Sequence, residues 1–374
     1  MDPLAYLDPR SGRTWPLDPP RWRADDGAPL LLTDMPGLAP EAIESGERSL
    51  WRYRAALPPL AGEPISMGEG CTPLLPRAIA GATALLKCEW MMPTGSFKDR
   101  GASVMLSLLR AQGVAEVLED SSGNGGAAIA AYAAAGGMRA RIMVPAATSP
   151  AKTVQARAAG AEIVLVPGSR QDCAEAALRE AERIFYASHN WHPFFLQGTK
   201  TLAYELWEDL GFQAPDNVIV PCGAGSNVLG CGIGFAELLR AGQIRSLPRL
   251  FAAQPANCAP IARAFLRLEP AAPQPTIAEG TAIAAPIRLR ECIGVLRQTR
   301  GGAVMLSEAE IGAATLELAR GGIHVEPTSA QAAAAFARLL RAGTIRPEER
   351  TVVVLTGSGL KATPRIAELL GLAV

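Results

Sequence analysis

The alternation of short apolar segments with helix-forming segments is the feature of this sequence that most constrains its fold. The apolar segments are rich in Val, Ile and Leu, and the segments between them are Ala-rich with helical spacing. Such alternation predicts parallel sheets covered by helices on both faces, which is an α/β fold. The predicted strands are 83–90, 116–122, 139–145, 161–168, 217–223, 249–254 and a last one that runs into a turn within 350–361. The predicted helices are 98–112, 126–137, 149–160, 171–185, 199–211, 227–242, 307–322 and 327–343, with a long aromatic loop at 186–198.

Length and charge narrow the class of protein. The 374 residues suit two domains rather than one core. Because 36 basic residues balance 36 acidic ones without a basic stripe, neither nucleic acid nor an anionic membrane surface is an obvious partner. No stretch approaches the roughly 20 apolar residues of a membrane span, and the first residues lack the layout of a signal peptide. The expectation is a cytoplasmic protein that acts on a small molecule.

Cysteine and histidine usage gives no metal site. The 7 Cys are scattered without a C-x-x-C pair, which is typical of reduced intracellular thiols. The 3 His show no ligand spacing, so no metal is expected. Cys222 could be a nucleophile beside a Gly-rich loop, but a buried, inert thiol is the more common use of such a residue.

Two Gly-rich loops each follow a predicted strand and open a predicted helix. They read "SSGNGG" (121–126) and "CGAGSNVLG" (222–230). Unpaired N–H groups at a helix start make such loops anion sites, although tight turns alone would also explain the glycines. The second loop lacks the G-x-G-x-x-G spacing, and the next strand ends in Gln254 rather than an acid, which disfavours a dinucleotide site. No Gly-Lys-Ser/Thr follows either, which excludes a P-loop. A site for one small phosphate group is the remaining interpretation of this loop.

A lone lysine precedes the first long helix in "PTGSFKDRG" (93–101). Lys98 lies where the helix macrodipole disfavours positive charge, so it is either a solvated lysine or one with a special role. A lysine, a phosphate cup and a second anion cup are together what pyridoxal phosphate requires. The lysine would form the Schiff base, one cup would hold the cofactor phosphate, and the other would hold a substrate carboxylate.

Several motifs together resemble those of one enzyme family. In order they are "PTGSFKDRG", "SSGNGGAA", "QGTKTLAYE", "CGAGSN", "VEPTSA" and "LTGSGLK". Their order and spacing across roughly residues 48–365 are similar to those of threonine synthase-like enzymes. These are fold type II (tryptophan synthase β-type) pyridoxal-phosphate enzymes, and homodimers are common among them.

The resemblance implies a domain plan and a role for each motif. It implies an N-terminal arm (1–47), a large cofactor-binding domain (48–98 with 191–374) and a smaller mobile domain (99–190). Lys98 would carry pyridoxal 5'-phosphate, Asn124 would bond its ring hydroxyl, and Thr356 would face its pyridine nitrogen. The remaining implied cofactor residues are Gly223, Ala224, Gly225, Ser226 and Asn227. The implied substrate carboxylate site is made by Ser121, Ser122, Gly123 and Gly125.

The sequence departs from threonine synthases where these bind the substrate phosphate. They usually have Thr at the position of Gly125 and Arg at that of Phe195. Lys152, Arg157, Lys200 or His192 could replace the missing charge. The family's Gly-His-Gly is Gly357-Ser358-Gly359 here, and the N-terminal arm resembles a zinc ribbon without its cysteines.

Three further residues have open roles. Glu279 occurs where some amino-acid dehydratases of this fold have an acid near the substrate, and a solvated loop acid is the alternative. His189 or His192 could move a proton, and satisfied loop histidines are the alternative.

Three functions are weighed against these residues. The first is a lyase for elimination or replacement at Cβ or Cγ of a small, unphosphorylated L-amino acid such as serine or threonine. Threonine synthase proper, which converts O-phospho-L-homoserine to L-threonine and phosphate, is close behind. A non-catalytic pyridoxal-phosphate-binding homologue is the alternative of another class, and the presence of Lys98, Asn124 and Thr356 speaks against it.

Overall fold

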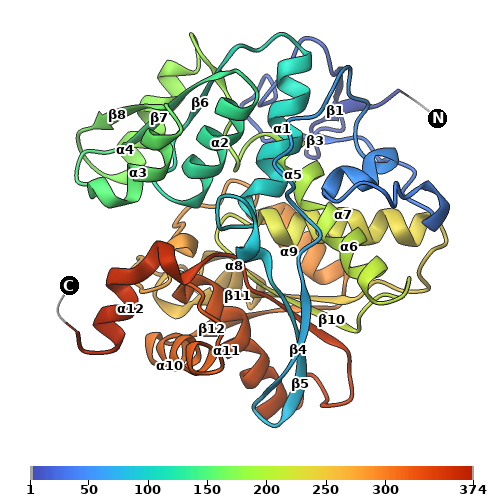
Figure 1. The fold of residues 1–374 in the computed structure, drawn as a ribbon, viewed down its shortest axis with the longest axis vertical. Helices are drawn as coiled ribbons and strands as arrows, with labels where there is room; N and C mark the ends of the chain where they lie inside the picture. Colours follow the sequence, from blue (N-terminus) through green and yellow to red (C-terminus); the bar gives the residue numbers. More distant parts are fainter. Residues whose placement is uncertain (1–2, 373–374) are drawn as a thin grey trace. The chain divides into compact units, whose positions relative to one another are not determined.

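The computed structural model describes residues 3–372, which form two compact units (Figure 1). The first unit joins the chain up to Gly70 to Lys98–Thr201. The second joins Cys71–Phe97 to the chain from Leu202 onward. The chain thus passes between the units after Gly70, after Phe97 and after Thr201, and the second crossing is the peptide bond that precedes Lys98. Within residues 3–372, no helix is long and apolar enough to cross a membrane.

The first unit is larger than the predicted mobile domain. Residues 48–70 belong to it because they are bonded to its first helix, as in the bond that the Ile65 N–H donates to Ser107 Oγ at 2.8 Å. Residues 191–201 belong to it because helix α5 packs along helix α1. The first unit thus joins residues on both sides of 99–190, and the mobile domain at 99–190 stays a prediction.

A parallel sheet with the strand order β8-β7-β6-β9 forms the centre of the first unit. Its strands are β6 (Glu116–Glu119), β7 (Arg139–Pro145), β8 (Glu162–Val166) and β9 (Phe185–Tyr186). Its helices are α1 (Lys98–Ala111), α2 (Asn124–Ala135), α3 (Pro150–Ala158), α4 (Arg170–Glu180) and α5 (Pro193–Thr199). Small alanine side chains let α1 and α2 pack closely, and both helices are buried along most of their length.

The N-terminal residues are more ordered than the predicted irregular arm. They form an antiparallel sheet of β1 (Ala5–Leu7), β2 (Thr14–Pro16) and β3 (Leu31–Leu32), followed by short 3₁₀ helices at Pro40–Ala42 and Leu50–Ala56. Trp22 packs edge-on against Tyr186 and Trp191, with ring centroids 5.1 and 5.4 Å away. Within residues 3–372, no cluster of three or more His, Cys, Asp or Glu side chains could hold a metal ion.

The aromatic segment predicted as a loop contains a helix, so that prediction was wrong. Helix α5 begins at Pro193, whose fixed φ suits the first helical position. His192 caps it, because its Nδ1 accepts a bond from the Phe194 N–H at 3.2 Å. The aromatic composition of this segment did not predict a helix, which packing and capping stabilise.

The second unit contains a six-stranded sheet in the order β12-β11-β10-β13-β5-β4, in which only the edge strand β4 is antiparallel. Its strands are β4 (Leu74–Ile79), β5 (Ala82–Lys87), β10 (Asn217–Pro221), β11 (Arg249–Pro255), β12 (Gly302–Leu306) and β13 (Thr351–Val354). Its α-helices are α6 (Thr201–Asp209, whose first residue belongs to the first unit), α7 (Ser226–Arg240), α8 (Pro260–Phe265), α9 (Leu289–Gln298), α10 (Glu308–Arg320), α11 (Pro327–Arg341) and α12 (Thr363–Leu369). Short 3₁₀ helices lie at Glu89–Met91, Ala256–Cys258, Glu279–Thr281 and Gly359–Ala362.

Three adjacent parallel strands of this sheet end at one edge. They are β10, β13 and β5, and ligands of open α/β sheets bind beyond the carboxyl ends of such strands. The Gly-rich loop follows β10, Thr356 follows β13, and the segment that leads to Lys98 follows β5. The topology therefore gathers three of the predicted motifs at this edge.

Candidate active site

The Gly-rich loop of the second unit is a cradle whose glycines leave no room for a side chain of their own. Gly225 has φ +97°, and a Cβ there would lie 2.1 Å from Cys292 Sγ. A Cβ on Gly223 would lie 3.2 Å from Thr281 Cα. Backbone N–H groups therefore line the start of α7, and this is the arrangement that binds phosphate.

Asn227, in the first turn of α7, is the clearest sign of a ligand at this loop. Its side chain is only 2% exposed, yet neither the oxygen nor the nitrogen of its amide has a hydrogen-bond partner. Leaving buried polar atoms unbonded costs about 1–3 kcal/mol, which a bound group would offset. The unpartnered amide and the glycine-lined cradle fit the phosphate of a cofactor.

Two other residues define the loop. Burial raises the pKa of the Cys222 thiol to about 12, so this cysteine is a packed thiol and no nucleophile. Gln254 Nε2 donates to the Cys222 carbonyl at 2.9 Å, and its Oε1 accepts from the Ala262 N–H at 2.9 Å. Gln254 thus anchors the loop from the neighbouring strand.

Thr356 lies in a polar network at the end of β13. Its Oγ1 is 3.1 Å from Ser329 Oγ, and that hydroxyl accepts from the Gly357 N–H at 2.7 Å. The Thr356 carbonyl accepts from the Phe97 N–H at 2.9 Å. The residue that precedes Lys98 is therefore held directly to Thr356. Sequence reasoning missed Ser329 as a positioning residue, although it lies inside the "VEPTSA" motif.

Lys98 is the first residue of α1, and an aromatic ring offsets its unfavourable place on the helix dipole. Its Nζ lies 5.6 Å from the centroid of the Phe195 ring, within the range of a cation–π interaction. Phe195 is fully buried and lies against Gly101, where a Cβ would approach within 2.4 Å of the ring. The ring beside Lys98 belongs to the residue at which the resemblance implies an Arg in threonine synthases.

The second predicted anion cup lies in the first unit, between β6 and α2. Asn124 begins α2, while Ser122 and Gly123 leave the backbone accessible. Gly125 is buried against His189, because a Cβ on Gly125 would lie 2.7 Å from two atoms of that ring. A side chain at this position would displace the imidazole.

His189 forms a buried pair with Glu119. Glu119 Oε2 accepts from the His189 backbone N–H at 3.0 Å and lies 3.0 Å from its Nδ1. Burial, followed by the nearby Lys98 charge, holds the pKa of His189 well below its usual range. Burial also raises the pKa of Glu119. The lowered pKa makes His189 neutral at neutral pH, and its Nδ1 lies within hydrogen-bond distance of Glu119 Oε2.

The other candidates have structural surroundings. Glu279 is exposed and pairs with Arg365 at 2.8 Å, which favours the solvated-acid interpretation. His192 is the cap of α5 and packs among aromatic rings. Lys200 is buried with its Nζ 3.4 Å from Met35 Sδ.

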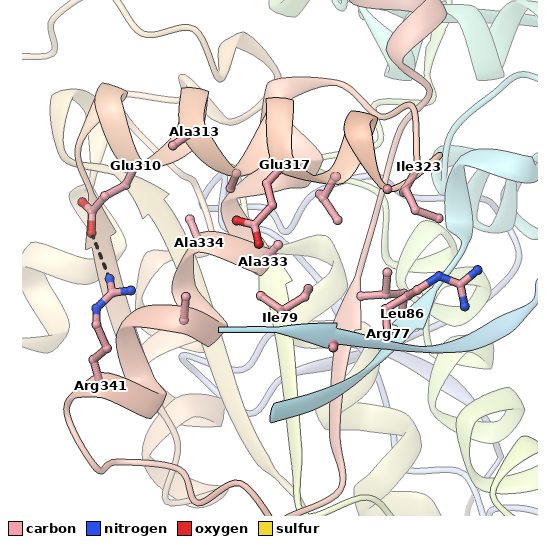
Figure 2. Close-up of a pocket in the computed structure, with 15 residues that line it drawn as sticks. Arg77, Ile79, Leu86, Glu310, Ala313, Glu317, Ile323, Ala333, Ala334 and Arg341 are labelled. Carbon is pink, nitrogen blue, oxygen red and sulfur yellow. Dashed lines mark ion pairs between the residues drawn. The ribbon is translucent and has the colours of Figure 1, made fainter. Parts of the chain in front are cut away.

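A separate cavity of about 200 Å³ lies in the second unit between β4, β5, α10 and α11 (Figure 2). Its floor is formed by Ile79, Leu86 and alanines of the two helices. Glu310 at its rim is bonded to Arg338 at 2.8 Å. Its lining includes no part of the Gly-rich loop, and its apolar floor does not suit a phosphate.

Comparison with known proteins agrees with this geometry. Residues 65–357 match the family model described as pyridoxal-phosphate dependent enzyme, and the chain belongs to that family. It is therefore an enzyme whose cofactor is pyridoxal phosphate, as the two cups and Lys98 predicted.

Within that class the chain is similar in sequence to several threonine synthases. The threonine synthase of Methanocaldococcus jannaschii is 34% identical over 334 residues, which are 86% of this chain and 82% of that protein. That of Mycobacterium tuberculosis is 34% identical over 320 residues, 83% of this chain and 87% of its own. The solved structure of a fungal L-serine ammonia-lyase from Rhizomucor miehei has a TM-score of 0.70 at 21% identity, covering 81% of this chain and 98% of that chain. The fold type II architecture is confirmed.

Proposed function

We propose that this pyridoxal-phosphate enzyme eliminates the side-chain hydroxyl of a small, unphosphorylated L-amino acid of the serine or threonine type. L-Serine would lose water from Cα and Cβ, and hydrolysis of the resulting enamine would give pyruvate and ammonia. The observation that carries the proposal is Phe195, a buried apolar ring where threonine synthases have an arginine. A phosphate dianion needs charge-assisted hydrogen bonds, each of which contributes about 1.5–3 kcal/mol, and a benzene ring offers none.

The site residues have the following proposed roles. Lys98 holds the cofactor covalently and, once released by the incoming amine, takes the Cα proton on its Nζ. The bound cofactor supplies an electron sink for the cleavage of the Cα–H bond. Asn124 bonds the ring hydroxyl, and Thr356 faces the pyridine nitrogen with Ser329 behind it. The cofactor phosphate is held by Gly223, Ala224, Gly225, Ser226 and Asn227, and the substrate carboxylate by Ser121, Ser122, Gly123 and Gly125.

Threonine synthesis from O-phospho-L-homoserine is the second candidate, because relatives at 34% identity carry that name. It needs a cation for the substrate phosphate. Lys152 and Arg157 of α3 belong to the same unit as the carboxylate loop and are the cations left to supply it, since Lys200 is buried against Met35.

A direct assay separates the two activities. The cofactor-loaded protein is given O-phospho-L-homoserine with a phosphate readout, and L-serine or L-threonine with a 2-oxo acid readout. We expect 2-oxo acid and little phosphate. Phosphate released in step with threonine would mean that the second candidate is right. Silence on all three substrates despite a lysine-bound cofactor would favour a replacement substrate or a non-catalytic homologue.

Location and assembly are also proposals. A cytoplasmic location is supported by seven cysteines that form no disulfide within residues 3–372. A homodimer is supported by the resemblance, because homodimers are common in that family. Light scattering of the purified protein tests it.

A further inference from the structure

The two departures from the threonine synthase pattern meet at one side chain. His189 lies against Gly125, and its ring is 5.7 Å from that of Phe195 in an edge-on arrangement at 61°. Phe195 in turn lies beside Lys98. We call Gly125, His189 and Phe195 the imidazole cluster. It lies entirely within the first unit, and two of its members, Gly125 and Phe195, are at the positions where threonine synthases usually have Thr and Arg.

Glu119 fixes the orientation of this imidazole. It is fully buried and holds both the backbone N–H and the Nδ1 of His189. Both carboxyl oxygens of Glu119 accept hydrogen bonds, Oε1 from the Asp120 N–H at 2.9 Å and Oε2 from the His189 N–H at 3.0 Å. Oε2 therefore faces Nδ1 as an acceptor, Nδ1 carries the proton, and the other ring nitrogen carries the lone pair. Nε2 is consequently the atom left for a ligand, as a hydrogen-bond acceptor.

An acceptor distinguishes a hydroxyl from a phosphate. A substrate hydroxyl can donate a hydrogen bond to Nε2. A phosphate dianion has only acceptor oxygens, so it cannot donate a hydrogen bond to Nε2. A site that holds a lone pair toward the substrate therefore disfavours the phosphorylated analogue.

We propose that His189 is a specificity-determining residue, whose Nε2 accepts a hydrogen bond from the side-chain hydroxyl of the amino-acid substrate and disfavours its phosphate ester. The proposal rests on the proposed function, because it takes the loop at Ser121–Gly125 as the place of the substrate carboxylate. It adds the contact that selects among substrates once the carboxylate is bound.

Matched substitutions test the contact. His189→Asn keeps a short amide within reach of Glu119 but removes the distal acceptor, whereas His189→Gln places an amide oxygen near the position of Nε2. His192→Asn is the control, because His192 is a nearby buried histidine and asparagine also caps helices well. We expect His189→Asn to lower kcat/KM for L-serine or L-threonine about 10–100-fold, His189→Gln to recover part of it, and His192→Asn to stay within about twofold of wild type.

A second readout does not depend on turnover. With only 3 His in the chain, ¹⁵N-histidine labelling gives few imidazole signals, which the His189 and His192 variants assign. We expect the Nε2 signal of His189 to move when L-serine is added and to stay in place with O-phospho-L-serine. An unmoved signal, or equal kinetics in His189→Asn and His192→Asn, would overturn the proposal.

Failure of the proposed function looks different. In that case wild-type protein would lack a borohydride-trapped cofactor on Lys98, or would release phosphate faster than 2-oxo acid. If wild-type protein binds the cofactor and is active, but neither the Nε2 signal nor the His189→Asn kinetics responds, only the specificity contact is wrong.

A substitution in the cluster checks the geometry independently. Gly125→Thr in the native background must push the His189 ring aside, so we expect a fall in Tm of about 5 °C or more. Combining Gly125→Thr with His189→Ala should recover most of that loss beyond the sum of the single effects. Additive shifts would mean that the ring does not occupy this space.

Discussion

The two Gly-rich loops of this enzyme have the same strand–loop–helix arrangement but different surroundings. Each leaves a parallel strand and opens a helix, as Gly225 does before α7 and Asn124 does at the start of α2. In the second unit the cradle is left open, and the Asn227 amide has no partner. In the first unit the cup is backed by the His189 ring and its buried carboxylate. The loop proposed for the cofactor phosphate is thus lined by backbone, whereas the loop proposed for the substrate has a buried titratable pair behind it.

The largest expected effect comes from Lys98→Ala, because Lys98 is the residue proposed to act together with both Gly-rich loops. The variant should lose the lysine-bound chromophore and at least about 10³-fold in kcat, because both attachment and proton transfer use Nζ. Absorbance and mass spectrometry after borohydride reduction measure the first effect. Lys152→Ala, on exposed α3, is the control and should retain the chromophore. A chromophore that survives Lys98→Ala would remove the central assignment.

Alanine at one glycine of each loop tests whether the two cups differ. Gly225→Ala must fit a Cβ at φ +97° against Cys292 Sγ, so we expect cofactor affinity to fall about 100-fold. Gly123→Ala meets nothing within 4 Å and should leave cofactor affinity unchanged. Fluorescence titration of apoprotein with the cofactor gives both numbers. Equal losses at the two positions would contradict the division of roles.

Asn227→Ala should have opposite effects on the apoprotein and the holoenzyme. Removing two unpartnered buried polar atoms stabilises the apoprotein by up to about 1 kcal/mol, whereas the lost contacts weaken cofactor binding about tenfold. Thermal unfolding with and without cofactor measures both. If Asn227→Ala lowers both quantities, the amide is structural and the cradle is held some other way.

The smallest expected effect is the pH dependence of the imidazole cluster. The folded pKa of His189 lies well below its usual 6.5, so below that pH the unfolded chain binds a proton that the native state refuses. Stability is therefore lost as pH falls through about 6.5. Glu119, with a raised pKa, acts in the opposite sense above its usual 4.5, and Lys98, Asp120 and Arg170 supply the surrounding charges.

The check is the slope of Tm between pH 6.5 and 5. We expect His189→Asn to flatten this slope relative to wild type, while His192→Asn keeps it. A wild-type slope that does not depend on residue 189 would place the acid sensitivity elsewhere.

Local rules in the sequence foresaw much of the fold. Strands β7 and β11 fall where runs of apolar residues predicted them, and the helix after Lys98 begins where the Gly-Ser turn suggested. The helix at Pro193–Thr199 escaped because its aromatic residues have low helix propensity and its cap is a histidine.

The candidate site was foreseen by motif but not by contact. Gly225 at the cradle carries its own signal, since a left-handed backbone at a βα turn requires glycine. The meeting of Gly125 with His189 joins residues that are distant along the chain, and no periodicity reports such a pair. The same holds for Ser329 behind Thr356, which only the three-dimensional sheet edge brings together.

The place of β5 in the sheet has a consequence for biosynthesis. Its parallel partner is β13, so the strand that leads to Lys98 must wait on the ribosome while roughly 260 further residues are added, or about 15–50 s at usual elongation rates. Until then Phe97 lacks the Thr356 carbonyl that fixes it, and the reactive lysine has no finished surroundings. We therefore expect translation products that end before Thr356 to bind no pyridoxal phosphate, so that cofactor binding begins only after Thr356 has been synthesised.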